Sequence, residues 1–135
     1  MNTVHVRNIT IGEGIPKICV PIVASSGDAI LKEARRFAGL PADLVEWRLD
    51  WFDGRFDLDE TRRLLAGLRE ALGDKPLLAT FRTFAEGGAC EKTGPGHYEA
   101  LVRNAVDSGC ADLVDVELAA GAGFLADLIP RAHDR

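Results

Sequence analysis

The sequence predicts an α/β fold in which four strand–helix units pair their strands as a parallel sheet. Strand-like segments begin near residues 17, 44, 76 and 113, and each is followed by a segment with helical periodicity. The connections between them are short, which favours right-handed crossovers. Glycines close three of the predicted helices, at Gly39, Gly73 and Gly109.

The first fourteen residues predict a small β-hairpin. Two short alternating runs within residues 3–14 break near Arg7 and Asn8 and end at glycines. Residues 17–23 then form a nearly continuous apolar run, typical of a strand covered on both faces. Pro21 removes one backbone donor from that strand.

Capping residues and apolar spacing predict the four helices. Residues 25–28 supply capping side chains for a first helix that ends at Gly39, and residues 57–60 resemble a capping box opening a second. The third helix is expected over 97–108, and the last over 121–133, weakened by Pro130. The predicted inward-facing side chains are Ile30, Ala34, Phe37, Ala38, Leu64, Leu65, Leu68, Leu72, Tyr98, Leu101, Val102 and Ala105.

Three successive predicted strands carry charged side chains on a single face. Alternation places Glu46 and Arg48 together in the strand 44–50, Arg82 in the strand 76–83, and Asp115 and Glu117 in the strand 113–118. A solvent-facing antiparallel strand would show the same alternation. If the sheet curls into a barrel with this face inside, these charges converge.

Convergence on an inner face predicts the first four βα units of a (β/α)₈ barrel, with an N-terminal hairpin. The active site of such a barrel lies at the carboxyl ends of the strands, near Arg48, Arg82 and Glu117. A complete barrel takes roughly 250 residues, and this sequence has 135. We therefore expect a single incomplete domain over 1–135, with the hairpin at 1–14 and a half-barrel at 15–135.

Composition excludes several partner classes. The net charge is −5 and there is no block of Lys and Arg, so neither nucleic acid nor a membrane surface is an expected partner. No segment approaches the roughly 20 apolar residues of a membrane span, and no signal peptide is apparent. Three cysteines without a CxxC pair suggest a reducing compartment, so a soluble, cytoplasmic protein is expected.

The charged residues suggest binding of an anion. Arg48 and Arg82 are fixed-charge forks suited to a carboxylate or to vicinal hydroxyls, and Glu46 could orient Arg48. Ion pairs that merely line a barrel are the alternative. Glu86 precedes Gly87-Gly88, which allow close backbone approach to a ligand, but it could equally be a solvated loop carboxylate.

Metal chemistry and amine catalysis find little support. Asp115-x-Glu117 with a distant histidine has no recognisable metal-ligand spacing. The lysines lie before strands, in a helix or in a loop, whereas a strand position would be needed for amine catalysis. They are Lys17, Lys32, Lys75 and Lys92.

Five motifs follow one another along nearly the whole chain. They are Ile11-Gly12-Glu13-Gly14-x-Pro16-Lys17-Ile18, Glu46-Trp47-Arg48-x-Asp50, Thr80-Phe81-Arg82-x-x-x-Glu86-Gly87-Gly88, His97-Tyr98 and Asp115-x-Glu117-Leu118. Each is weak alone, but the combination is specific and resembles the N-terminal half of type I 3-dehydroquinate dehydratase.

The resemblance implies a (β/α)₈ barrel, usually a homodimer, with a hairpin closing its bottom. It implies a lyase of the shikimate pathway, and hence of aromatic amino acid biosynthesis. Members convert 3-dehydroquinate to 3-dehydroshikimate through a Schiff base on a lysine, without a metal or organic cofactor. By motif, Glu46, Arg48 and Arg82 correspond to substrate-binding residues, and Glu86 to the glutamate that partners a catalytic histidine.

The sequence departs from the family in ways that leave three hypotheses open. The family's histidine motif on the fifth strand and its lysine on the sixth are not among these residues, and Pro21 stands where some members carry a serine. The chain could be a shortened dehydratase that turns nothing over alone. It could be a non-catalytic half-barrel that self-associates through its open strand edges. A doubly wound, four-stranded binding domain is the third possibility.

Overall fold

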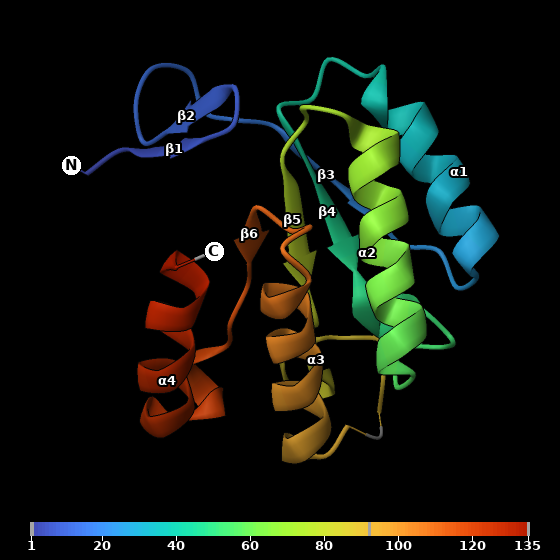
Figure 1. Cartoon of the computed structure of the whole chain (residues 1–135), viewed down its shortest axis with the longest axis vertical. Helices are drawn as coiled ribbons and strands as arrows, with labels where there is room; N and C mark the ends of the chain where they lie inside the picture. Colours follow the sequence, from blue (N-terminus) through green and yellow to red (C-terminus); the bar gives the residue numbers. More distant parts are fainter. Residues whose placement is uncertain (1, 92, 135) are drawn as a thin grey trace.

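The computed structural model describes residues 2–91 and 93–134 and shows an α/β fold with a four-stranded parallel sheet and a separate antiparallel hairpin (Figure 1). The hairpin pairs β1 (Val4–Val6) with β2 (Ile9–Ile11). The sheet contains β3 (Cys19–Ile22), β4 (Leu44–Arg48), β5 (Leu77–Thr80) and β6 (Leu113–Val114). The helices are α1 (Gly27–Ala38), α2 (Leu58–Leu72), α3 (Pro95–Ser108) and α4 (Ala122–His133). The predicted fold class is confirmed.

The strands follow their order in the chain, β3-β4-β5-β6. Successive helices pack against one another along the sheet, α1 on α2, α2 on α3 and α3 on α4 (Figure 1). A doubly wound sheet reverses its strand order at a switch point and carries helices on both faces. The sequential order therefore contradicts the doubly wound alternative and leaves the inner face of a barrel segment uncovered by helices.

The first two helices begin where their caps were predicted. The Ser26 hydroxyl accepts a hydrogen bond from the Ala29 N–H at 3.3 Å. Asp57 Oδ1 accepts from the N–H groups of Asp59 and Glu60, both at 3.0 Å. A side-chain cap of this kind contributes about 1 kcal/mol to helix stability because it pairs N–H groups that lack partners within the helix.

The hydrophobic core lies between the sheet and the helices. Val45 and Trp47 on β4, Leu77 on β5, and Leu65 and Leu68 on α2 are fully buried. Burying one such side chain contributes about 1.5–3 kcal/mol. The predicted inward face of each of the first three helices is confirmed, although Ala38 is only partly buried. Since the core uses the outer face of the sheet, the charged inner face is left for function.

The expectation that residues 17–23 are covered on both faces is wrong. Ile18 and Val23 are 57% and 50% exposed, and only Ile22 within β3 is fully buried. Among the described residues β3 pairs with β4 alone, so it is an edge strand, and Cys19 and Pro21 on its other face are exposed. An edge strand also explains how Pro21 is tolerated.

Several predicted boundaries shift. β6 covers Leu113–Val114 rather than 113–118, because the backbone leaves the ladder after the Asp115 N–H bonds Ala79 O at 3.0 Å. β5 likewise ends at Thr80. α3 begins at Pro95 rather than residue 97. α4 runs through Pro130 to His133, so this proline removes one backbone donor without ending the helix.

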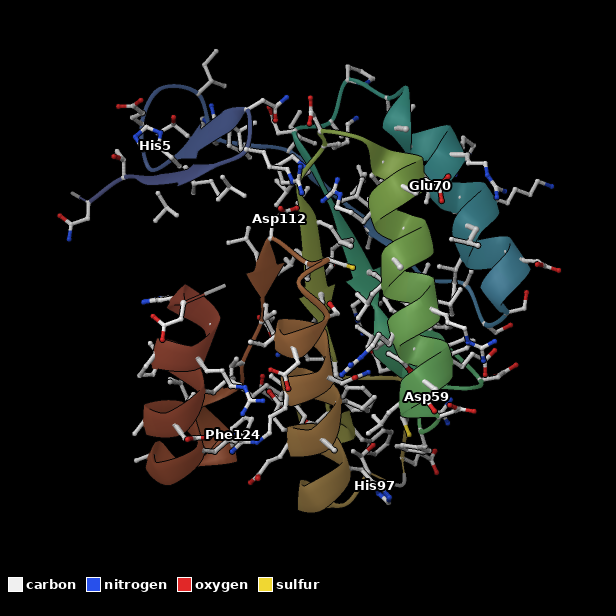
Figure 2. All side chains as sticks on the ribbon, viewed as in Figure 1. His5, Asp59, Glu70, His97, Asp112 and Phe124 are labelled. Atoms are coloured by element: carbon white, nitrogen blue, oxygen red, sulfur yellow. The ribbon has the colours of Figure 1, made fainter. Side chains whose placement is uncertain are left out.

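Asp112 fastens the hairpin to the amino-terminal ends of β5 and β6. Its carboxylate accepts hydrogen bonds from Nε of Arg7 and Nη1 of Arg69, both at 2.5 Å, and from the Leu77 N–H at 2.8 Å. Figure 2 shows Asp112 beneath the hairpin, at the opposite end of the molecule from Asp59 and His97 in the first turns of α2 and α3. In the part of the chain that the structure describes, no helix combines the length and hydropathy that crossing a membrane requires.

Candidate functional site

The charged residues gather at the carboxyl ends of the strands, at the end opposite Asp112. Arg48 is the last residue of β4, Arg82 lies two residues beyond β5, and Asp115 follows β6 directly. This is the same end as the amino termini of α2 and α3 (Figure 2). Parallel pairing of the three strands brings these side chains into one cluster.

Asp50 holds Arg48 in a two-pronged ion pair. Nε and Nη2 of Arg48 donate to Oδ1 and Oδ2 of Asp50, both at 2.9 Å. The pair forms because the short 3₁₀ helix Leu49–Trp51 follows β4 at once and turns the carboxylate back toward the guanidinium. Among the described residues, Nη1 of Arg48 has no hydrogen-bond partner, so this nitrogen can meet a ligand.

The same carboxylate bonds the backbone of the neighbouring segment. Asp50 is 1% exposed and accepts the N–H of Arg82 at 3.3 Å and that of Ala89 at 2.9 Å. Burial alone would raise the pKa of Asp50, but the bonds from Arg48 and from these two N–H groups outweigh it and lower the pKa. Asp50 therefore stays a carboxylate at a more acidic pH than an ordinary aspartate does.

Arg82 is surrounded by three carboxylates. Nη1 donates to Glu86 Oε2 at 2.9 Å and to Glu117 Oε1 at 3.0 Å, while Nη2 donates to Asp115 Oδ1 at 2.9 Å. Burial opposes the charge, yet Asp115 and Glu117 raise the pKa of Arg82 above its ordinary value. The guanidinium is thus permanently charged and fixed in direction.

Glu117 links Arg82 to the loop that follows β5. It is 5% exposed, and its two oxygens accept the Thr83 N–H at 2.8 Å and the Thr83 hydroxyl at 2.6 Å. Its own N–H donates to the Tyr98 hydroxyl oxygen at 2.8 Å. Both carboxylate oxygens and the N–H of this buried residue are therefore paired, as burial of a charge requires.

The loop carrying Glu86 folds tightly against the end of β5. The N–H groups of Glu86 and Gly88 both donate to Thr83 O, at 3.1 and 2.8 Å. A Cβ on Gly88 would lie 1.8 Å from Arg82 O, so only glycine fits there. The fold of this loop presents Glu86 half exposed beside Arg82.

The structure brings together most of the predicted site. Arg82, Glu86, Asp115 and Glu117 are in direct contact, and Arg48 joins them through Asp50. Glu46 shares the inner face of β4 with Arg48 but makes no hydrogen bond or ion pair with any described residue. The suggestion that Glu46 orients Arg48 is therefore wrong, because Asp50 occupies both prongs of the fork.

Asp50 is the residue that sequence reasoning passed over. Its alternation with Arg48 was visible, but the strand was expected to continue through it. The signal was a carboxylate two residues after an arginine at a strand end, which a short turn can fold back into an ion pair. Thr83 and Tyr98, which hold Glu117, gave no comparable signal.

No described group of three or more His, Cys, Asp or Glu side chains is arranged to hold a metal ion. The lysines that the structure describes are also remote from the cluster. Lys75 precedes β5 at the far end of the sheet and donates to Phe37 O and Leu40 O at 3.0 and 2.6 Å. Lys17 precedes β3, Lys32 is in α1, and Lys92 lies outside the described residues.

Comparison with known proteins gives one consistent result. Residues 18–135 match the family model described as type I 3-dehydroquinase. A 3-dehydroquinate dehydratase of Clostridium botulinum is 41% identical over 132 residues, covering 97% of this chain and 51% of the relative. One of Enterococcus faecalis is 46% identical over 118 residues, covering 87% and 46%.

Solved structures agree. A type I 3-dehydroquinate dehydratase of Clostridium difficile, with covalently modified comenic acid, superposes with a TM-score of 0.93 at 39% identity and covers 98% of this chain and 52% of that one. The Enterococcus faecalis enzyme gives 0.92 at 44% identity, covering 97% and 54%. The chain thus spans about half the length of the relatives it matches.

Proposed function

Because the chain belongs to the type I 3-dehydroquinase family, we propose that its charged cluster binds the substrate during dehydration of 3-dehydroquinate to 3-dehydroshikimate. The observation that carries the proposal is the convergence of Arg48, Arg82 and Glu86 at the carboxyl ends of adjacent strands. This is the end at which barrels of this kind place their active sites.

Each group has a role that its geometry supports. Arg48 offers its unbonded Nη1, held in direction by Asp50, to an oxygen of the substrate. Glu46, on the same inner face, accepts from a substrate hydroxyl. Arg82 supplies a second fixed cation. Glu86, anchored by Arg82 at 2.9 Å and half exposed, partners the histidine that shuttles the proton.

The proposal assigns no turnover to this polypeptide alone. Schiff-base chemistry requires a lysine in the site, and the described lysines lie elsewhere. The cluster also holds two guanidinium groups against five carboxylates: Glu46, Asp50, Glu86, Asp115 and Glu117. A carboxylate substrate meets a net negative field there, so binding is weak until further cations join the site.

The test combines turnover and binding. Adding 3-dehydroquinate to the chain is expected to give no rise in enone absorbance, and borohydride is expected to leave the protein mass unchanged. In ¹⁵N NMR titration, the Arg48 and Arg82 side-chain signals should shift, while the exposed Arg36 on α1 serves as the control. Enone formation would overturn the absence of turnover, and unshifted arginines at millimolar ligand would overturn substrate binding.

A second candidate rests on the open edges of the sheet. Within residues 2–91 and 93–134, β3 and β6 each pair on one side only, and β3 is flanked by the exposed Ile18 and Val23. Unpaired parallel edges invite pairing, so the chain could act as a half-barrel that self-associates as a binding module. A discrete dimer in sedimentation would favour this candidate, and a compact monomer would contradict it.

A further inference from the structure

We propose that Asp50 is the positioning residue of this site, setting the direction of Arg48 and the placement of Glu86 together. The proposal rests on the proposed function, since it names the residue that prepares the same cluster for substrate. Asp50 would not touch the substrate itself. It would act through the groups it holds.

Both oxygens of Asp50 are fully used. Oδ1 accepts from Arg48 Nε at 2.9 Å and from the Arg82 N–H at 3.3 Å, and Oδ2 accepts from Arg48 Nη2 and from the Ala89 N–H, both at 2.9 Å. The side chain is completely buried. Bonds to a buried carboxylate are stronger than neutral ones, so this arrangement resists displacement.

The two backbone donors bracket the segment that carries Glu86. Arg82 begins that segment and Ala89 ends it, so a single carboxylate fastens both ends. Inside the bracket, the loop is closed by the bonds of Glu86 and Gly88 to Thr83 O. A shift of Asp50 would therefore move the Arg48 fork and the Glu86 carboxylate at once, which an ordinary ion pair would not do.

Asp112 provides a matched control at the other end of the strands. It also pairs with arginines, Arg7 and Arg69, and accepts a backbone N–H, that of Leu77. The two carboxylates thus play similar structural parts, but only Asp50 contacts the proposed site. Loss of either should lower stability, and loss of Asp50 alone should disturb the cluster.

The experiment compares Asp50→Asn with Asp112→Asn in the full chain. The asparagine side chain has an NH₂ group in place of one carboxylate oxygen. The two N–H donors that bonded that oxygen lose their acceptor, so half of the four hydrogen bonds are lost. We expect amide exchange at Ala89 to become about ten-fold faster in D50N, and the Arg48 Nε signal to lose its protection. In D112N, the exchange of the Ala89 amide and the protection of Arg48 Nε should equal those of wild type once the change in global stability is taken into account.

Ligand binding supplies the functional readout. With 3-dehydroquinate as the probe, D50N should weaken the NMR-detected affinity about ten-fold, and D112N should leave it unchanged. Equal effects of both variants on Ala89 exchange would reduce Asp50 to a structural residue and overturn the inference. If wild type binds no 3-dehydroquinate, the proposed function fails, while the exchange data still decide whether Asp50 positions the loop.

If D50N does not fold, Asp50→Glu takes its place. Glutamate keeps the charge but adds a methylene, so it cannot meet all four donors at their present distances. We expect the same loss of protection at Ala89. Protection equal to wild type would mean that charge alone suffices, and would overturn a positioning role.

Discussion

Nη1 of Arg82 donates to Oε1 of Glu117 at 3.0 Å, and that same oxygen accepts the Thr83 N–H at 2.8 Å. The side chain of one residue and the backbone of the next are therefore fixed by a single buried atom. Since Arg82 follows β5 and Glu117 follows β6, this bond ties the ends of two adjacent strands together. It is the point at which the inner-face charges become one network.

Replacing Glu117 tests how much the charge contributes. Glu117→Gln keeps the shape and can still bond Thr83, but it removes the anion from Arg82. We expect a loss of about 1–2 kcal/mol in the free energy of unfolding, measured with urea, because bonds to charged groups exceed neutral ones by about 1 kcal/mol. Asp115→Asn, at a carboxylate one-third exposed, should cost less than about 1 kcal/mol. Equal losses of unfolding free energy in the Glu117 and Asp115 variants would contradict the expectation that the more buried carboxylate contributes more.

Three glycine-to-alanine variants test the fold of the Glu86 loop. Gly88→Ala should be strongly destabilising, by about 3 kcal/mol or more, because the new Cβ meets Arg82 O at 1.8 Å. Gly87→Ala adds only the cost of a positive φ of 88°, about 1–2 kcal/mol. Gly96→Ala, in the open first turn of α3, should be neutral or stabilising. Thermal unfolding ranks the three, and a tolerated Gly88→Ala would show that the loop adapts.

Local patterns in the sequence were sufficient for the fold and for much of the site. Capping residues and apolar spacing placed α1 and α2 because these signals act within one element. Alternation placed Arg48 and Arg82 on a common face because a strand has a period of two. The exposure of β3 was not predicted, because a continuous apolar run does not show whether another segment packs against the strand.

The partners of the charged residues could not be predicted from the strand pattern. Glu46 and Asp50 are both two residues from Arg48, and alternation treats them alike. Asp50 rather than Glu46 pairs with Arg48 because of the short 3₁₀ helix Leu49–Trp51, which the strand pattern does not predict. The bonds of Glu117 depend likewise on where β6 ends, and strand ends are set by tertiary contacts rather than by propensity.

Cys19 offers a test of where the Glu46 carboxylate lies. The two residues share the inner face of neighbouring strands, and partial burial together with the Glu46 charge raises the pKa of the Cys19 thiol to about 11. Less thiolate is then present at pH 8. Allowing for the greater nucleophilicity of a more basic thiolate, we expect alkylation by iodoacetamide about ten-fold slower than for an ordinary cysteine.

Site-resolved mass spectrometry can follow this reaction. Glu46→Gln should lower the thiol pKa and speed the alkylation of Cys19, because it removes the neighbouring negative charge. Glu70→Gln, at an exposed position on α2, is the control and should change nothing (Figure 2). An unchanged rate in E46Q would place the carboxylate away from Cys19.

The lowered pKa of Asp50 predicts a specific loss of stability in acid. In the unfolded chain an aspartate has a pKa of about 3.9, so between that value and the lower folded pKa the unfolded state binds more protons. The contribution of Asp50 is therefore complete above about pH 4 to 5 and is lost as the pH falls through the folded pKa.

Urea unfolding between pH 2.5 and 6 should show stability rising with pH in wild type. In Asp50→Asn the rise in stability with pH should be smaller, because the proton that Asp50 releases no longer contributes to the slope. Parallel curves for D50N and wild type would mean that the pKa of Asp50 is the same in the folded and unfolded chains, which would contradict the two-pronged pair with Arg48.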